Sequence, residues 1–252
     1  MEKPDRLSAL LTRFELQASV LADPVDTAAN MLLLGSPADG IIEQVWFWPI
    51  GSPVGGADET LRARVVTAAT VSLGGEANPM ARALPECMMM AVAPDSMVND
   101  LAQLIGREAK AGRCGGYSTL QRLFEVLVIL LLRHALEQEQ RQPGLIAGLA
   151  DDRLCRALVA IHEAPECPWR IETLAELAGL SRSQFMARFA EKVGQTPFGY
   201  LRQWRLMLAR QDLAAGDRVK TVASRYGYGS QEALSRAYRQ YFGQAPRDAR
   251  SV

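Results

Sequence analysis

The chain has 252 residues, 48% of them hydrophobic and 22% charged, and its 28 basic and 28 acidic side chains cancel to a net charge of +0. This length is enough for two ordinary domains that each bury a core. The longest uninterrupted apolar run, Val126 to Leu132, is far shorter than the ~20 residues of a membrane-spanning helix, and the charged start is unlike a signal peptide. We therefore expect a cytoplasmic protein that does not interact with membranes.

The charge is divided unevenly along the chain. Residues 151–252 carry 16 basic and 11 acidic side chains, a net of +5, whereas residues 1–150 carry 12 and 17, a net of −5. A basic half beside an acidic half favours one domain that binds nucleic acid and one that does not.

Motifs of common enzyme and metal chemistry are missing from the sequence. The two histidines and four cysteines form no HxH, HExxH or CxxC pattern, and neither a GxSxG nucleophile elbow nor a phosphate-binding glycine loop occurs. We predict no catalytic residue, no metal site and no cofactor. Cys87 and Cys114 are candidate redox sensors, because Arg113 beside Cys114 would favour a thiolate; the alternative is that both are ordinary reduced thiols.

The amino-terminal half reads as a short helix, several strands and two long helices. Leu7–Arg13 is the short helix, and alternation or apolar clustering predicts strands at Phe14–Val20, Met31–Leu34, Ile41–Trp48 and Ala63–Leu73. Short strands between turns rich in Gly and Pro predict an antiparallel barrel or sandwich. Trp46 and Trp48 would share a strand face, either as ligand-pocket walls or as core.

Two helices and a linker complete this half. The helices are expected at about Ser96–Ala111 and Ser118–Gln138, and Gln140–Leu145 resembles a linker between a domain of residues 1–140 and one of residues 150–252. The second helix is apolar around much of its circumference, with Leu123 and Leu130 among its leucines. Such a helix needs cover on more than one side, so it either forms a homodimer interface or packs on the strands.

The carboxy-terminal half contains the same helix, turn and capped helix twice. In the first unit Ile171–Ala178 is a short helix, Gly179 ends it, and Ser181 with Gln184 forms a capping box for a helix that buries Phe185 and Phe189. The second unit has an apolar stripe at Val219, Val222, Ala223 and Tyr226, then Gly227, the cap Ser230 and the inward-facing Leu234 and Tyr238. A helix of about 18 residues, Pro197 to Ala215, joins the units. It is long enough to hold two recognition helices about one DNA turn (~34 Å) apart.

These pieces resemble the DNA-binding domain of the AraC/XylS family of bacterial transcription regulators, over about Asp152 to Arg250. The matching pieces are Ile171–Ala175, Ser181, Phe185, Phe189, Gly194, Pro197, Tyr200, Leu201, Arg205, Leu208, Ala209, Val222, Ala223, Gly227, Tyr228, Ser230, Arg236, Phe242, Gly243 and Pro246. The resemblance implies a transcription regulator that binds promoter or operator double-stranded DNA, with RNA polymerase and an unknown small-molecule effector as further partners. The residues expected at the DNA are Arg182, Ser183, Gln184, Met186, Ala187, Arg188, Gln231, Glu232, Ser235, Arg236 and Arg239.

Within this set we separate base readers from other contacts. Arg182, Ser183, Gln231, Glu232, Ser235 and Arg236 are expected to include the base readers, whereas Arg188 and Arg239 are expected to make structural or phosphate contacts.

The amino-terminal half is similar to the cupin-type sensor domains of the same family. The similarity rests on Thr67–Gly75 followed by Asn78–Pro85, and on the order of strands, helical pair and linker. The cupin metal histidines are absent, so a sensor here would work without that metal. The expected fold is α+β: a short antiparallel cupin-like sheet with a helical pair, then an all-α domain with two helix-turn-helix units. The alternative is a cupin-type enzyme that binds a small molecule and carries an accessory helical domain.

Overall fold

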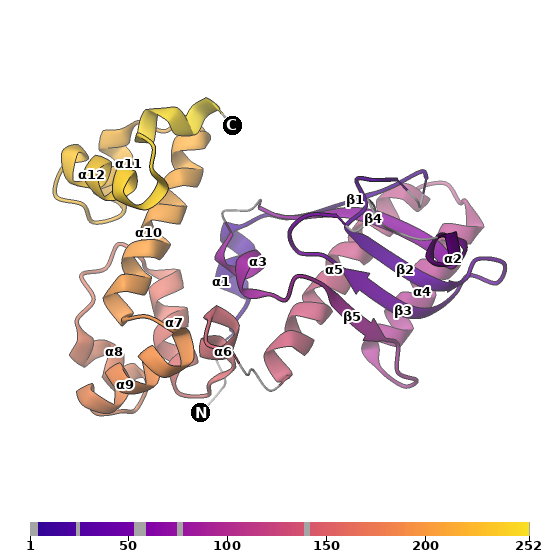
Figure 1. The fold of residues 1–252 in the computed structure, drawn as a ribbon, viewed down its shortest axis with the longest axis horizontal. Helices are drawn as coiled ribbons and strands as arrows, with labels where there is room; N and C mark the ends of the chain where they lie inside the picture. Colours follow the sequence, from indigo (N-terminus) through magenta and orange to yellow (C-terminus); the bar gives the residue numbers. More distant parts are fainter. Residues whose placement is uncertain (1–4, 24–25, 53–58, 75–77, 139–141, 252) are drawn as a thin grey trace. The chain divides into compact units, whose positions relative to one another are not determined.

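The protein is described by a computed structural model that covers residues 5–23, 26–52, 59–74, 78–138 and 142–251 (Figure 1). The chain divides into two compact units. One is Phe14–Glu139, and the other combines Met1–Arg13 with Gln140–Val252. The first helix of the chain therefore belongs with the carboxy-terminal helices and not with the sheet that follows it in the sequence.

The Phe14–Glu139 unit is built on one antiparallel sheet of five strands. The strands are β1 (Leu16–Val20), β2 (Met31–Ser36), β3 (Ile41–Phe47), β4 (Val65–Leu73) and β5 (Met88–Ala91), in the spatial order β1-β4-β2-β3-β5. The first four lie where the sequence predicts strands. The sequence gives no signal for β5, because its run of three methionines is not β-branched and four residues are too short for a readable alternation.

Two long helices cover one face of the sheet. They are α4 (Met97–Ala111) and α5 (Gly116–Glu137), which pack on each other and contact β1, β3 and β4 (Figure 1). The short helices α2 (Glu59–Ala63) and α3 (Pro79–Ala83) lie in the connections before β4 and β5. Many of the apolar side chains of α5 are buried within the unit; Phe124, Leu127 and Val128, for example, have no exposed surface.

The opposite face of the sheet carries a small apolar cluster. Leu32 lies opposite Trp46 on one neighbouring strand and opposite Ala68 on the other, so these three side chains form a row on one face. Trp46 and Trp48 are partly buried against this cluster, with their rings edge to face and their centroids 6.0 Å apart. This packing favours the core interpretation of the two tryptophans.

The second unit is helical. Its elements are α1 (Ser8–Arg13), α6 (Leu145–Ala150), α7 (Leu154–Glu163), α8 (Ile171–Leu177), α9 (Arg182–Val193), α10 (Pro197–Ala214), α11 (Val219–Arg225), α12 (Gln231–Phe242) and the 3-10 helix η1 (Pro246–Ser251). Helix α1 contacts α7, and the Arg6 guanidinium donates to the carbonyl of Ala150 (3.3 Å) and pairs with Asp152 (2.8 Å).

Helix α6 begins at Leu145, the last residue of the expected linker. It packs on α7 and α9 so closely that a Cβ atom on Gly148 would be 2.7 Å from Val193 and 2.8 Å from Leu158. The expected linker, Gln140–Leu145, therefore overlaps the first residue of a core helix; residues 139–141 lie outside the described part of the chain.

His162 is a buried polar side chain at the end of a helix. It lies in the last turn of α7, but it is only 2% exposed and its Nε2 lies 2.5 Å from the hydroxyl of Tyr200. The imidazole also packs on the ring of Trp204, with centroids 4.5 Å apart. The partners come from α10, about forty residues further along the chain, so local helical position does not reveal the burial.

Candidate nucleic-acid interface

The first helix-turn-helix unit is α8, its turn and α9. Gly179 has a φ of +62°, which only glycine adopts without strain, and it turns the chain out of α8. Ser181 and Gln184 form the predicted capping box at the start of α9. Phe185 and Phe189 are completely buried, with ring centroids 5.5 Å apart, and they fix which face of α9 looks outward.

The outward face of α9 holds the side chains expected at DNA, but several of them already have partners. Arg182 pairs with Glu172 of α8 at 3.2 Å, and the Gln184 side chain is occupied in the capping box. Ser183 and Ala187 are exposed, and Met186 is half-buried. The side chains on the outward face of α9 are therefore mostly short and, apart from Arg182, largely uncharged.

Arg188 differs from its neighbours on α9 because it is bound to another helix. Its Nε donates to Asp151 Oδ2 at 2.8 Å, and a terminal nitrogen lies 2.7 Å from the same oxygen. Burial alone would raise the pKa of Asp151, but the hydrogen bonds from Arg188 and from the backbone of Leu154 and Arg153 outweigh it and lower that pKa. These contacts support a structural role for Arg188.

The second helix-turn-helix unit is α11, its turn and α12. Gly227 has a φ of +71° and ends α11, and the Ser230 hydroxyl accepts from the backbone N–H of Ala233 at 3.2 Å. Leu234 and Tyr238 are completely buried. Their burial leaves Gln231, Glu232, Arg236 and Arg239 exposed and Ser235 half-buried, as the helical period predicts.

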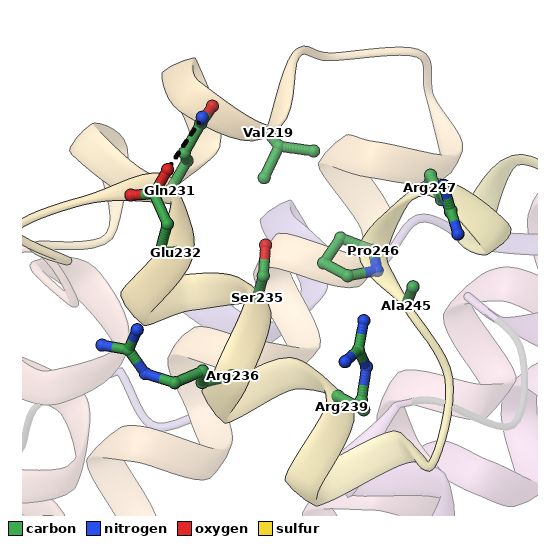
Figure 2. Close-up of a pocket in the computed structure, with 9 residues that line it drawn as sticks. All are labelled: Val219, Gln231, Glu232, Ser235, Arg236, Arg239, Ala245, Pro246 and Arg247. Carbon is green, nitrogen blue, oxygen red and sulfur yellow. Dashed lines mark hydrogen bonds between the residues drawn. The ribbon is translucent and has the colours of Figure 1, made fainter.

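These outward side chains of α12 surround a hollow of about 480 Å³ (Figure 2). It is lined by Val219, Gln231, Glu232, Ser235, Arg236, Arg239, Ala245, Pro246 and Arg247. The Gln231 Nε2 donates to Glu232 Oε1 at 3.0 Å. In Figure 2 the guanidinium groups of Arg236 and Arg239 point away from each other, and that of Arg239 lies beside Pro246. The hollow thus brings together all five residues that the sequence analysis chose on α12.

Arg247 also lines this hollow, and no local pattern in the sequence predicts it there. It is contributed by η1, which follows α12 after the turn at Gly243 and Pro246. The sequence shows that Arg247 is basic, but its position beside α12 depends on the fold of this turn. A neighbouring hollow of about 460 Å³ includes Lys220 and Ser224 of α11 with Gln231 and Glu232, so a second basic side chain lies beside the same helix.

Helix α10 connects the two units and is anchored in the core. Trp204, Leu208 and Leu213 are buried. The Arg205 guanidinium donates to the carbonyls of Pro165 (2.5 Å) and Cys167 (2.8 Å), which ties the loop after α7 to α10. The helix contacts α9, α11 and α12, so it holds both helix-turn-helix units in one body.

Cys87 and Cys114 lie in different environments. Burial, reinforced by the charge of Glu86, raises the pKa of the Cys87 thiol, which disfavours the thiolate that a redox sensor needs. Cys114 is exposed, and the guanidinium of Arg113 pairs with Glu108 at 3.3 Å. The described part of the chain contains no group of three or more His, Cys, Asp and Glu side chains arranged for a metal ion. Among those residues, no helix is both long and apolar enough to cross a membrane.

Comparisons with known proteins match both units. A helix-turn-helix domain family matches residues 174–251, and a cupin family matches residues 17–137. An uncharacterized HTH-type transcriptional regulator of Haemophilus influenzae is 35% identical over 60% of this chain and 51% of its own length. A putative AraC-like transcription regulator of Streptomyces lividans is 39% identical over 50% of this chain and 43% of its own length. The chain spans about half the length of the curated relatives it matches.

Among solved structures, the chain is similar to the DNA-binding domain of AdpA, a global transcriptional factor crystallised with a target DNA. That likeness has 31% identity and a TM-score of 0.38, and it covers 40% of this chain and 92% of the other. The chain therefore combines a cupin domain with a helix-turn-helix domain, and relatives that it matches are named AraC-like transcription regulators.

Proposed function

We propose that the protein binds specific sites in double-stranded DNA and regulates transcription from them. The observation that carries this proposal is the pair of capped, outward-facing helices, α9 and α12, held in one body by α10. Helices of this kind enter the major groove, and the basic surplus of residues 151–252 would neutralise phosphates. In this proposal residues 150–252 bind the DNA and residues 1–140 form the sensor.

The site residues divide by their contacts. Arg182, Ser183, Gln231, Glu232, Ser235 and Arg236 include the base readers, Arg239 makes a phosphate contact, and Arg188 supports α9 through Asp151. Gln184, Met186 and Ala187 complete the surface of α9 that faces the groove. Arg247 joins Arg239 as a phosphate contact, because both line the hollow beside α12.

The remaining parts of the proposal concern regulation. The cupin unit would bind a small-molecule effector without a metal ion, and RNA polymerase would be the partner at the promoter. A homodimer formed through the outer side of α5 would place four recognition helices on repeated half-sites, and effective concentration would raise the affinity. Because a bacterial chromosome lies in the cytoplasm, the DNA target places the protein there.

An enzymatic function is the weaker alternative. A cupin-type enzyme with an accessory helical domain would share the sheet of the Phe14–Glu139 unit. The matched relatives, however, are named transcription regulators, and this favours a protein without catalytic activity. Of the two cysteines, only the exposed Cys114 remains a proposed redox group. The raised pKa of Cys87 disfavours the thiolate that such a group needs.

The test is DNA binding by the full-length protein at two salt concentrations. Fluorescent duplexes are taken from the promoters next to the gene itself and from random sequence. We expect tighter binding to a promoter duplex and a steep loss of affinity as salt rises, because phosphate contacts release counterions. Equal affinity for promoter and random duplexes would instead indicate an architectural DNA binder, and an absence of binding at low salt would refute the proposal.

A further inference from the structure

We propose that α12 reads a cytosine and a guanine that lie within about three base pairs of each other, with Glu232 selecting the cytosine and Arg236 the guanine. This inference rests on the proposed function and names the DNA sequence class that one of the two recognition helices prefers.

Glu232 and Arg236 occupy the same edge of α12. Both are exposed, and they are four residues apart, about one helical turn or 6 Å along the axis. Stacked base pairs rise 3.4 Å each, so two side chains with this spacing reach neighbouring or next-nearest base pairs. Figure 2 shows the Arg236 guanidinium extending away from those of Arg239 and Arg247. Glu232 and Arg236 therefore lie at one end of the hollow, and Arg239 and Arg247 lie at the other end.

The carboxylate of Glu232 restricts the choice of base. The hydrogen bond from Gln231, followed by one from its own backbone and one from Ser230, lowers the pKa of Glu232, so this group is an anion that only accepts hydrogen bonds. In the major groove, only cytosine N4 and adenine N6 offer donors, and adenine places the acceptor N7 beside its amino group. A carboxylate repels N7, O6 and O4 acceptors, so cytosine is the base it tolerates best.

The arginine supplies the complementary preference. A guanidinium has donors spaced to contact O6 and N7 of guanine together, and this is the commonest specific contact of arginine in the major groove. Arg236 carries this fork one turn after Glu232 on an exposed face. Arg239, whose guanidinium points away from Arg236 and lies beside Pro246, is placed for the phosphates that flank the same bases.

Helix α9 lacks this combination, so the stretches of DNA contacted by α9 and by α12, the two boxes of the site, differ. The outward residues at the start of α9, Arg182, Ser183, Met186 and Ala187, include no acidic side chain, and Arg188 is bound to Asp151. Small apolar side chains contact thymine methyl groups and discriminate weakly. The strong cytosine and guanine preference therefore belongs to the box under α12.

The experiment selects binding sites from a random-sequence duplex library with the full-length protein. We expect one box with an enriched cytosine and an enriched guanine. The Glu232→Gln variant should replace the cytosine by adenine at that one position, because a glutamine amide pairs with adenine N6 and N7. Arg236→Ala should lose the guanine preference by roughly 5- to 150-fold while the rest of the site is kept.

Arg239→Ala is the matched control, since it removes an arginine from the same helix. It should weaken binding to all sequences alike and leave the selected site unchanged. If the wild-type protein selects a site and Glu232→Gln selects the same one, the assignment to Glu232 is overturned while the proposed function stands. If the wild-type protein selects no sequence, both fail. Circular dichroism of each variant confirms that these exposed substitutions leave the fold intact.

Discussion

Arg188 of α9 is bound to Asp151, the residue that joins α6 to α7. Both Nε and a terminal nitrogen of the guanidinium contact Asp151 Oδ2, at 2.8 and 2.7 Å, and the aspartate side chain is only 4% exposed. The other oxygen of Asp151 accepts from the backbone N–H groups of Arg153 and Leu154, each at 3.0 Å, and so caps the start of α7. One carboxylate therefore fixes α9 against α7.

Replacing Arg188 by alanine should lower the stability of the helical unit by about 1 kcal/mol, because the arginine is partly exposed and water replaces some of its hydrogen bonds. Asp151→Ala should cost more, about 2 kcal/mol, since it also removes the cap of α7. Urea unfolding measures both. Neither variant should change the selected DNA sequence. Unchanged stability together with altered preference at one base would make Arg188 a base reader.

Acid should destabilise the helical unit through His162. Burial lowers the pKa of His162 from 6.5 to about 3, so the folded state keeps the imidazole neutral while the unfolded state binds a proton below pH 6.5. The contribution of His162 to the free energy of unfolding is fully present above pH 6.5. It falls by about 1.4 kcal/mol per pH unit between pH 6.5 and pH 3, because only the unfolded state gains protons there.

The measurement is urea unfolding at pH 7.5 and pH 5.5, in the full-length protein and in a His162→Gln variant. Glutamine can still bond to the Tyr200 hydroxyl but does not titrate. The wild type should lose more stability than the variant over this interval. Parallel losses in both proteins would show that His162 is protonated in the folded state or that other groups cause the effect.

The thermal stability of the DNA-binding unit should depend on α6. Leu145, Ile146 and Leu149 are buried, and Gly148 fits closely against Val193 and Leu158. A fragment of residues 150–252 should still bind DNA at low salt, but it should melt at a lower temperature than a fragment of residues 144–252, because it exposes part of α7 and α9. Thermal melts of the two fragments check this. Equal melting temperatures would contradict a structural role for α6.

Local signals made most of the helical unit predictable. Glycines after α8 and α11, serine caps before α9 and α12, and aromatic side chains at helical spacing each act within a few residues. The same periods correctly indicated which side chains of α9 and α12 face outward. These features needed no knowledge of distant parts of the chain.

The missed features depend on contacts between distant residues. Strand β5 forms because Met90 pairs with Val45, far along the chain, and nothing in its own composition favours a strand. The burial of His162 and the particular partner of Arg188 also depend on such contacts, since Tyr200 and Asp151 lie 38 and 37 residues away. Arg247 reaches the hollow beside α12 only through the turn that precedes η1.

The proposed dimer should depend on the outer side of α5. Leu130, which was first expected to take part in this interface, is 9% exposed and belongs to the core, whereas Val126 is 45% exposed and Leu123 is half-buried. Val126→Glu should therefore leave the unit folded and convert a dimer to a monomer, since a charge in an apolar interface is costly. Light scattering measures the mass, and binding to a full operator should weaken as effective concentration is lost.

Ala63→Glu on α2 is the matched control, an exposed apolar residue changed in the same way, and it should remain dimeric and bind normally. Leu130→Glu should behave differently from both, because it introduces a charge into the core and should unfold the sheet unit. A wild-type protein that is monomeric at micromolar concentration, with and without DNA, would show that the apolar side chains of α5 serve only the core. If the Val126→Glu variant is still a dimer, the dimer interface lies on another surface of the protein.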